Sequence, residues 1–579
     1  MAEQKAQGLD VKAILDEAEQ GKRHKQAYWN STWQMTYEFF DNRKADFTSS
    51  LSPGAFLSFN DIWTSLPALV RDKAASALLG NVWPDNHSFS YEPFGEDRKD
   101  DAEVEDWFAQ ATETVQNELD EPEARFSMSL EEVMQSYVTD GTPLLLLEKG
   151  RESLYAFGAY NVQQFSAAEG RRGVLNCFYL EPPYTVQTLV AEFTLNGVSE
   201  RVREMYRQGK KGDAVRVIHA IKPREVQNGK GYGPKNMAVM SVHIEADTKH
   251  VLRESGYEEQ PAFAPRLARR IGEIYGRGWG MRAMPDVLQL NEMWEIVTLG
   301  AEKIADPPLY SFFSEDMDTS PGALNAPAWD HKMMQALGSR SPIGPVQDVG
   351  NLAFLDGLIE RLEAILNTHF MIDRLVDQDN STEMTYGEFA GRRSIRQEQT
   401  RNVTGRFYSE MMDPALRRAF NVALRAGRFG YVEGTPEYNA ALQVSRTGKV
   451  RMIPRKILDL QGRKQSVYRL RYTTPAARER RLEEAQGILN WTEYLGKASQ
   501  YDRTALEEIN TERSSNTLAD IWNVPDTCKN TPEEKKALRA AAQKGAEEDR
   551  KLAQAQGAAV VAKDMASAKA AQAQAAVPA

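Results

Sequence analysis

Large apolar side chains recur at three- and four-residue steps along the first part of the chain, which is the spacing of one face of a helix. Asp61 is placed to cap a second helix that ends near Gly80, and further helices are expected over about 100–120 and 126–139. The N-terminal part is therefore predicted to be helical. The first stripe, predicted to be a buried helix face, consists of Tyr28, Trp29, Trp33, Tyr37 and Phe40.

From Gly141 to about residue 270 the pattern changes to short β-favouring runs separated by Gly, Pro, Arg or Glu. The runs are LLLLE, SLYAFGAY, VLNCFYL and VQTLVAEF, and the alternation in VMSVHIEAD indicates a surface strand. A Gly-rich stretch over 228–234 fits an exposed turn between strands. We expect a small sheet region with helices behind it.

Two helices of similar length are predicted in the middle of the chain. The first covers 285–305 and opens with Pro285 at a first-turn position. The second covers 350–370, where apolar residues follow a regular three- and four-residue repeat. Residues 306–349 are rich in Pro, Gly and Ser, which predicts an irregular module between the two helices.

The chain after residue 370 is expected to be mostly helical. The final stretch, 534–579, is rich in Ala, Gln and Lys and can bury little surface alone, so it either frays or forms a helix that identical neighbours stabilise. The other expected elements are, in order, a polar connection over 371–383, a long helix that ends near Glu410, a helix that starts at Asp413-Pro414, a strand in QSVYRLRY, and helices over 475–496 and 502–522.

Composition limits the class of protein. The 579 residues should form about three or four compact units, at roughly 100–200 residues per domain. Cys177 and Cys528 are the two cysteines, which excludes a disulfide framework and a Cys-rich metal site and suits a reducing compartment. No apolar signal core and no run near the ~18 apolar residues of a bilayer span is present, so synthesis in a cytoplasm is expected.

Charge and motifs argue against tight nucleic-acid binding and against catalysis. The formal net charge of -11 disfavours a surface that grips DNA everywhere, but it permits one past which DNA slides. No phosphate-binding Gly-x-x-x-x-Gly-Lys-Ser/Thr motif occurs. We therefore expect no catalytic, cofactor or metal site. One set of acidic residues and histidines could meet a metal ion, although a surface strand is the favoured interpretation: His243, Glu245, Asp247 and His250.

A series of short motifs, spread over some 400 residues, is more informative in its order than in any single member. The order resembles the head-to-tail connector, or portal, proteins of short-tailed bacteriophages. The motifs are Asp140-Gly141-Thr142, Val217–Ile221 with Pro223-Arg224, Glu254–Tyr257, Tyr275–Gly278, Met284–Asp286, Leu290–Met293, Met384-Thr385, Arg392-Arg393 with Gln397, Gly405-Arg406, Ser409–Leu416 with Arg418 and Phe420, Tyr472–Ala477, and Ile509–Pro525.

The resemblance implies a mainly helical α+β fold that assembles as a ring, usually of twelve subunits, around a DNA channel at one capsid vertex. It divides each subunit into wing, stem, clip and crown. Mapped onto this chain, the divisions are a wing over 1–284 and 384–470, stem helices over 285–305 and 350–370, a clip over 306–349, a channel loop over 371–383, crown helices over 471–533, and the Ala-rich tail or barrel helix over 534–579.

The implied role is a structural, non-enzymatic conduit through which double-stranded DNA is packaged and later ejected, without a cofactor. The implied partners are other copies of the chain, transiently bound DNA, major capsid and scaffolding proteins, the terminase motor, and tail adaptor and nozzle proteins. The implied location is the virion, with assembly in the host cytoplasm. Two alternatives stay open: a minor capsid or tail-adaptor protein without a channel, and an enzyme subunit of the packaging or injection apparatus.

Charge on the second predicted stem helix suggests which residues line the channel. Duplex DNA carries one charge per about 1.7 Å, so a lysine-lined bore would bind strongly, whereas an acidic or mixed lining repels. Arg361 and Arg374 would then make transient phosphate contacts. A merely solvated helix face explains the same pattern equally well. The candidate lining residues are Asp356, Glu360, Arg361, Glu363, Arg374, Asp377 and Asp379.

Overall fold

The computed structural model places most of the chain in helices and the rest mainly in antiparallel sheets, so the predicted α+β, mainly helical class is confirmed. The chain divides into two compact units at residue 476, not three or four, because one continuous apolar core joins residues from Phe40 to Ile457. The structure describes residues 10–41, 61–84, 89–94, 102–170, 173–224, 236–305, 309–311, 343–345, 353–372, 403–432, 435–436, 452–454, 457, 468–472 and 475–498, with a few positions beyond.

The N-terminal part is helical, as predicted, and one helix start was wrong. α3 begins at Leu66 after Ser65, with Pro67 in its first turn, because the fixed φ of proline suits that position. Asp61 instead accepts a hydrogen bond at its carbonyl oxygen from Asn291 Nδ2, at 3.0 Å. The helices are α1 Val11–Tyr28, α2 Asn30–Phe40, α3 Leu66–Val82, α4 Ala102–Asp120 and α5 Phe126–Thr139.

The aromatic stripe is buried except at its first member. α1 ends at Tyr28, whose side chain is 72% exposed, and the chain turns at Trp29 into α2. Trp29 stacks on Trp33 with ring centroids 5.3 Å apart, and Tyr275 meets Trp33 edge-on at 5.3 Å. The stripe therefore anchors two helices to a distant turn.

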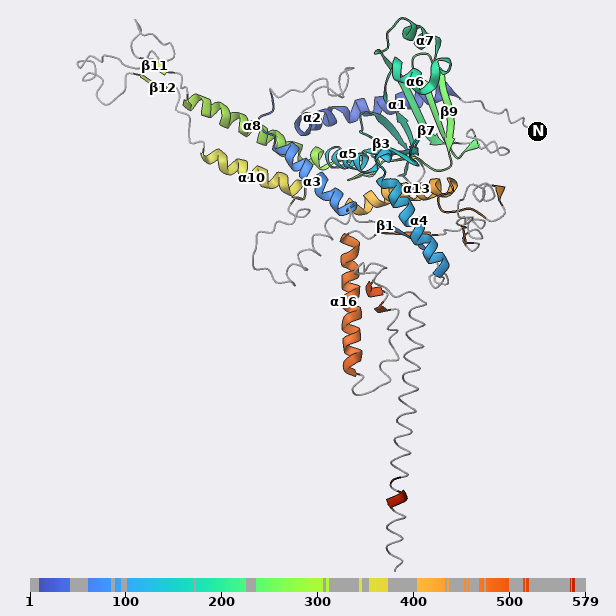
Figure 1. Ribbon diagram of the computed structural model, residues 1–579. Coiled ribbons are helices and arrows are strands. Elements are labelled where there is room, and N and C mark those ends of the chain that lie inside the picture. Colours follow the sequence, from blue (N-terminus) through green and yellow to red (C-terminus); the bar gives the residue numbers. More distant parts are fainter. Residues whose placement is uncertain are drawn as a thin grey trace, which may run out of the picture. The chain divides into compact units, whose positions relative to one another are not determined.

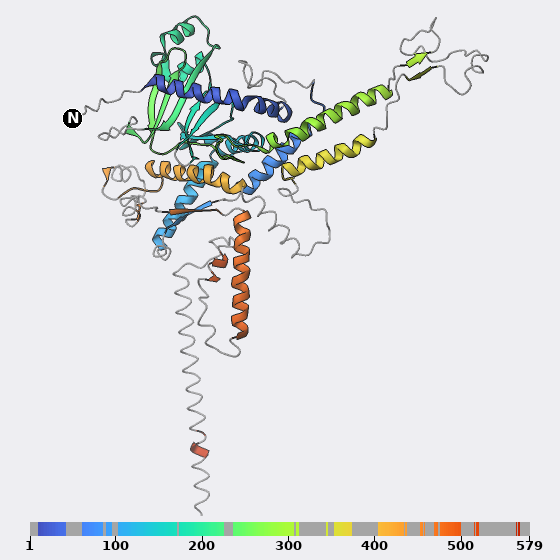
Figure 2. The same ribbon diagram turned by 180° about the vertical axis from the view of Figure 1, so that it is seen from behind.

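An antiparallel sheet with the strand order β4-β5-β7-β8-β9 forms the centre of the β region, and β6 pairs with β7. Successive side chains point to opposite faces, so Ile218 and Val242 pack against α1 while Val215 and Val217 pack against α6 and α7. Figure 2 shows α1 crossing the sheet. The strands are β4 Phe165–Glu169, β5 Leu175–Leu180, β6 Pro183–Thr185, β7 Ala214–Pro223, β8 Val239–Glu245 and β9 Val251–Tyr257.

Two predictions about this region were wrong. The strand in VMSVHIEAD, β8, is buried at all seven positions because helices cover both faces of the sheet. VQTLVAEF is not a strand but the start of helix α6, Val186–Gly197. Thr185 and Thr188 form a reciprocal capping box there, which starts a helix in spite of β-favouring residues. The short helix α7, Glu200–Arg207, follows.

Two smaller sheets join segments that are far apart in the sequence. β2, Leu144–Lys149, pairs with β3, Tyr155–Tyr160, and with β10, Ala262–Phe263. β1, Phe89–Pro93, pairs antiparallel with β13, Tyr468–Tyr472, which confirms the strand predicted in QSVYRLRY. The Tyr91 hydroxyl donates to the carbonyl of Leu416 at 2.8 Å, within helix α13, Asp413–Arg425.

The two predicted middle helices are present as α8, Trp279–Ala305, and α10, Ala353–His369, and they pack side by side (Figure 1). β11, Leu309–Ser311, pairs with β12, Ile343–Pro345, between them in the sequence. α16, Pro475–Ala498, belongs almost entirely to the second unit and matches the helix predicted over 475–496. Several predicted segments lie outside the described residues: the loop over 228–234, the connection over 371–383 from residue 373 onward, the long helix before 403, and nearly all of 502–522 and 534–579.

Candidate DNA-channel segment

The start of α8 is set by two of the motifs, Asp140–Thr142 and Tyr275–Gly278, which we call the clasp. Gly278 N donates to the Asp140 carbonyl at 3.0 Å, and Leu267 N donates to the Gly141 carbonyl at 3.0 Å. A Cβ atom at Gly278 would lie 2.2 Å from the Thr139 carbonyl oxygen, and Gly141 has a φ of 89°. Only glycine permits these two backbones to approach so closely.

The side chain of Asp140 is the polar centre of the clasp and is fully buried. Its carboxylate accepts hydrogen bonds from Tyr37 Oη at 2.8 Å, Ser136 Oγ at 2.6 Å and Thr142 N at 2.8 Å. Burial raises the pKa of Asp140 to about 6, although these three hydrogen bonds act to lower it. The clasp thus fixes α2, α5 and the turn before α8 to one buried acid.

α8 begins at Trp279, six residues before the predicted start at Pro285. The contacts of the clasp hold Gly278, the residue before the helix, in place. Pro285 therefore lies inside the helix, where its missing N–H removes one backbone hydrogen bond. Ala283, Met284 and Val287 around it are buried in the main core. Their burial offsets the lost hydrogen bond and keeps the helix continuous.

α10 packs on α8 through one apolar stripe. Ile359, Leu362, Leu366 and Phe370 are buried in the core shared with α8. The Phe370 ring lies with its centroid 5.4 Å from that of Phe40 in α2 and 6.3 Å from that of Trp279 in α8. At the same end of the pair, His369 Nε2 lies 3.0 Å from Asp286 Oδ2. One end of the helix pair is thereby attached to the main core.

The structure brings together three of the predicted lining residues. Asp356, Glu360 and Glu363 lie at four- and three-residue steps, on a side of α10 that differs from its apolar stripe. Asp356, Glu360 and Arg361 are exposed and Glu363 is half-buried, and none forms a salt bridge within the described part of the chain. Arg374, Asp377 and Asp379 lie outside the described residues.

The sequence argument missed the acidic residues of α8, because they alternate with the apolar positions that predicted the helix. Glu292 and Glu302 are exposed and Glu295 is half-buried. Across α8 and α10 the acidic residues outnumber the basic ones: Asp286, Glu292, Glu295, Glu302, Asp356, Glu360 and Glu363 against Arg282, Lys303 and Arg361.

A family model described as "Bacteriophage head to tail connecting protein" matches residues 12–528. The chain belongs to this family. The head-to-tail connector resemblance expected from the motif order is therefore confirmed, and with it the structural class of protein and its association with the phage virion.

Two curated relatives of this head-to-tail connecting protein carry matching names. A "Probable portal protein" of Bordetella phage BPP-1 is 30% identical over 271 residues, which cover 45% of this chain and 48% of the relative. A "Portal protein" of Salmonella phage epsilon15 is 21% identical over 464 residues, 78% of this chain and 77% of the relative. The chain thus spans about half the length of the first relative and about three quarters of the second.

The candidate metal set in the connector's sequence does not come together. Among the described residues, no group of three or more His, Cys, Asp or Glu side chains is arranged to hold a metal ion. His243 instead stacks on His219 with ring centroids 3.8 Å apart, beneath α6. Burial lowers the pKa of His219 to about 3, which keeps its ring neutral near pH 7.

Membrane insertion finds no support among the described helices. None of them combines the length and the hydrophobicity that a bilayer crossing requires.

Proposed function

We propose that this chain is the subunit of a portal ring, with twelve subunits expected from the family resemblance, through which double-stranded DNA enters and leaves the phage head at one capsid vertex. The role is structural, and no catalytic step is assigned to the chain. The single observation that carries the proposal is the match to head-to-tail connecting proteins over residues 12–528. The portal names of both relatives agree with it.

The α8–α10 pair supplies the proposed stem. The excess of carboxylates on these helices suits the wall of a DNA conduit, because phosphate and carboxylate charges repel and DNA does not bind there strongly. Asp356, Glu360 and Glu363 form the candidate lining on α10. In this proposal 306–349 is the clip and 371–383 the channel loop.

Exposed apolar residues on the same helices support assembly. Phe354 is 70% and Ile304 56% exposed in the isolated chain, and Leu288, Ile296 and Leu299 are exposed as well. A ring of copies would cover such residues through head-to-tail contacts, in which two different surfaces of the subunit meet and the rotation closes. The exposed apolar stretch and the carboxylates then serve neighbouring subunits and the channel, respectively.

The remaining assignments are proposed from the resemblance to the family. The proposed wing covers 1–284 and 384–470, and the proposed crown and tail cover 471–579. The ring would contact major capsid and scaffolding proteins during assembly in the host cytoplasm, then the terminase motor, and finally tail adaptor and nozzle proteins. These partners are proposed for the assembled ring and not for the single chain.

Negative-stain electron microscopy of the purified full-length protein tests the proposal. We expect closed rings of about twelve subunits with an open centre, and neither ATP hydrolysis nor DNA cleavage in parallel assays. A monomer that forms no ring in any buffer, or a compact particle without an aperture, would contradict the portal role and favour an adaptor or minor capsid protein. Hydrolysis or cleavage would favour an enzyme subunit.

A further inference from the structure

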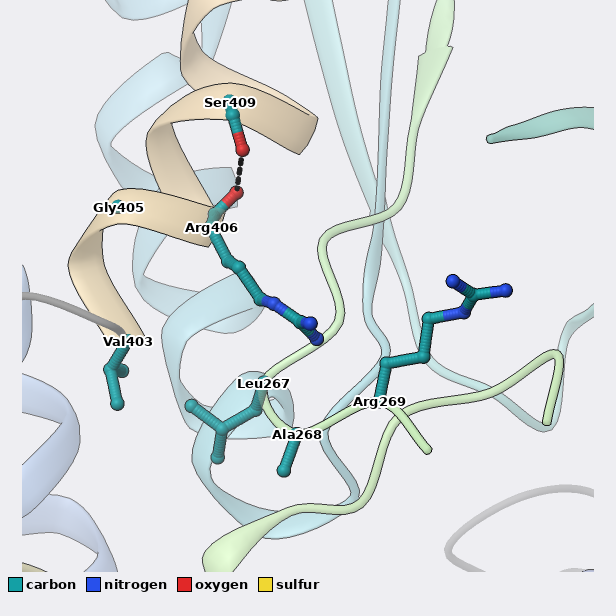
Figure 3. A pocket seen from close by; sticks show the side chains of 7 residues that line it. All are labelled: Leu267, Ala268, Arg269, Val403, Gly405, Arg406 and Ser409. Carbon is teal, nitrogen blue, oxygen red and sulfur yellow. Dashed lines mark hydrogen bonds between the residues drawn. The ribbon is translucent and has the colours of Figure 1, made fainter. Parts of the chain in front are cut away.

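A pocket of about 610 Å³ is lined in part by Leu267, whose backbone N–H donates to Gly141 of the clasp (Figure 3). One wall is the segment that follows β10, and the other runs from the helical turn at Val403 into the π-helix Tyr408–Met412. Its volume suits one or two side chains of another molecule rather than a single water. The lining residues are Leu267, Ala268, Arg269, Val403, Gly405, Arg406 and Ser409.

The carboxylates of Glu169 and Glu410, near this pocket, already form salt bridges with arginines. Arg266 is buried and pairs with Glu169 at 2.6 Å and with Glu410 at 3.1 Å. Arg269 pairs with the same Glu169 at 2.8 Å. Two carboxylates thus already serve two guanidinium groups and are not available to neutralise a third.

Three further arginines lie in the segments that form the pocket walls. Arg277 is neutralised by Glu273, at 2.6 Å. Arg270 is exposed and Arg406 is half-buried, and the described residues give neither of them an ion-pair partner. Figure 3 shows the Arg406 side chain reaching across toward the segment that carries Leu267 and Ala268. The pocket therefore has excess positive charge on a chain whose net charge is -11.

An apolar side chain accompanies this charge. Ile271, next to Arg270, is fully exposed. Protein interfaces are enriched in arginine around a few apolar contacts, and this pair of residues has that composition. We call Arg270, Ile271, Arg406 and the pocket between 267–269 and 403–409 the basic surface.

We propose that the basic surface binds carboxylate side chains of a second copy of this chain, as one half of the contact between neighbouring subunits. The chain itself supplies the complementary charge, with 82 acidic against 71 basic residues, and the exposed Glu292 and Glu302 of α8 lie outside the candidate lining. A guanidinium group binds a carboxylate through two parallel hydrogen bonds, which fixes orientation as well as adding energy. The proposal rests on the proposed ring, because a ring contact joins two different surfaces.

Site-specific photocrosslinking identifies what the basic surface touches. Ile271 is replaced by p-benzoylphenylalanine in the full-length protein, and the same replacement at Met128, which is 62% exposed on α5, serves as the control. We expect 271 to crosslink to an acidic segment of a second copy in preparations that contain rings. Crosslinks confined to the same chain, or to added duplex DNA alone, would overturn the proposal.

Charge substitution tests the energetic role. Arg406→Glu and the milder Arg406→Gln are compared with Arg151→Glu, an exposed arginine in the β2–β3 turn. We expect the Arg406 variants to need about tenfold or more protein to form rings, with circular dichroism unchanged, and Arg151→Glu to behave as wild type. Sedimentation at several salt concentrations supplies the measurement.

The outcomes separate this inference from the portal proposal. If the wild-type protein forms no rings, the portal proposal fails. If wild-type rings form and Arg406→Gln rings form at the same concentration, the portal proposal stands and the basic surface is not a subunit contact. If Arg406→Gln forms normal rings but loses affinity for duplex DNA, the surface binds phosphate and the inference is wrong.

Discussion

The clasp and the α8–α10 pair are neighbours in the fold, but the carboxylate of the clasp is buried whereas those of α10 are exposed. Asp140 in the clasp is fully buried, and three donors satisfy its carboxylate. Asp356 and Glu360 on α10 are exposed and form no salt bridge within the described residues. A buried carboxylate with hydrogen-bond donors around it specifies one local structure. An exposed carboxylate without a salt bridge contributes little to the stability of the fold and is available to another molecule.

The largest expected effect comes from the closest backbone contact in the clasp. Gly278→Ala places a Cβ 2.2 Å from the Thr139 carbonyl oxygen, so two backbone segments must separate. We expect a loss of about 3 kcal/mol or more in the free energy of unfolding, measured by urea denaturation. Gly80→Ala is the matched control, because Gly80 lies in α3 and a Cβ there would have nothing within 4 Å. That substitution should be neutral or stabilise by up to about 1 kcal/mol, and equal losses in both variants would contradict the role of the close contact.

Next in size is the pH dependence caused by Asp140. Burial raises its pKa from 3.8 to about 6 in the folded chain, so the folded state binds its proton more tightly than the unfolded state. Its contribution to stability is therefore fully present below pH 3.8 and is lost as the pH rises through 6. Compared with Asp140→Asn, which does not titrate, the wild type should lose about 2 kcal/mol in the free energy of unfolding between about pH 4 and pH 7.

Thermal unfolding of both proteins at several pH values measures this difference. Asp140→Ala, which leaves the Tyr37 hydroxyl and Thr142 N–H without their acceptor, should be less stable than Asp140→Asn at every pH. Parallel pH curves for the wild type and Asp140→Asn would show that Asp140 does not titrate in this range.

A smaller difference in stability is expected between truncating a buried and an exposed apolar residue of the helix pair. Leu362 is 7% exposed in the α8–α10 contact, and Leu362→Ala should lower the free energy of unfolding by about 2 kcal/mol. Ile304 is 56% exposed on α8, so Ile304→Ala should change it by less than about 0.5 kcal/mol. Chemical denaturation of the two variants measures both values. A loss of comparable size at Ile304 would mean that this residue is already buried within the single chain.

The smallest effect on stability, and a distinct effect on DNA, is expected from reversing exposed charges. Asp356→Lys with Glu360→Lys should leave the fold unchanged within about 0.5 kcal/mol but strengthen duplex DNA binding by the rings. In a plot of the logarithm of the binding constant against the logarithm of the salt concentration, each new phosphate contact should make the negative slope steeper by about 0.9. Glu131→Lys with Glu132→Lys, on exposed positions of α5, makes the same change in net charge. If both pairs increase DNA binding equally, the effect reports net charge and not the channel.

Local pattern predicted the elements whose signals are repeated along the chain. The helix over 126–139 has the predicted bounds, and Ile359, Leu362 and Leu366 are buried on α10 as their spacing indicates. VQTLVAEF was misassigned because β-favouring residues outweighed the weak capping signal of Thr185 and Thr188. Asp61 was misassigned because several polar residues before an apolar run can each cap a helix, and packing selects among them.

For the candidate site too, the sequence predicted only the part whose residues are close together in the chain. The spacing of Asp356, Glu360 and Glu363 was enough to place them on one side of a helix. The apolar repeat of the same helix indicated which side is buried, so the exposure of Asp356 and Glu360 follows from local pattern as well. The basic surface was not predicted at all, because Arg269 and Arg406 are distant in sequence and line one pocket only when the chain folds.

Taken alone, the sequence determined the mainly helical composition, the helix pair around an irregular module, and the family through the order of its motifs. These features depend on residues that are close together in the chain, or on order along it. The tertiary structure decided that β8 is buried on both faces, that Gly278 must lie against Thr139, and that Arg406 has no carboxylate of its own among the described residues. Burial and charge pairing depend on distances between residues remote in sequence, and only the folded chain sets those distances.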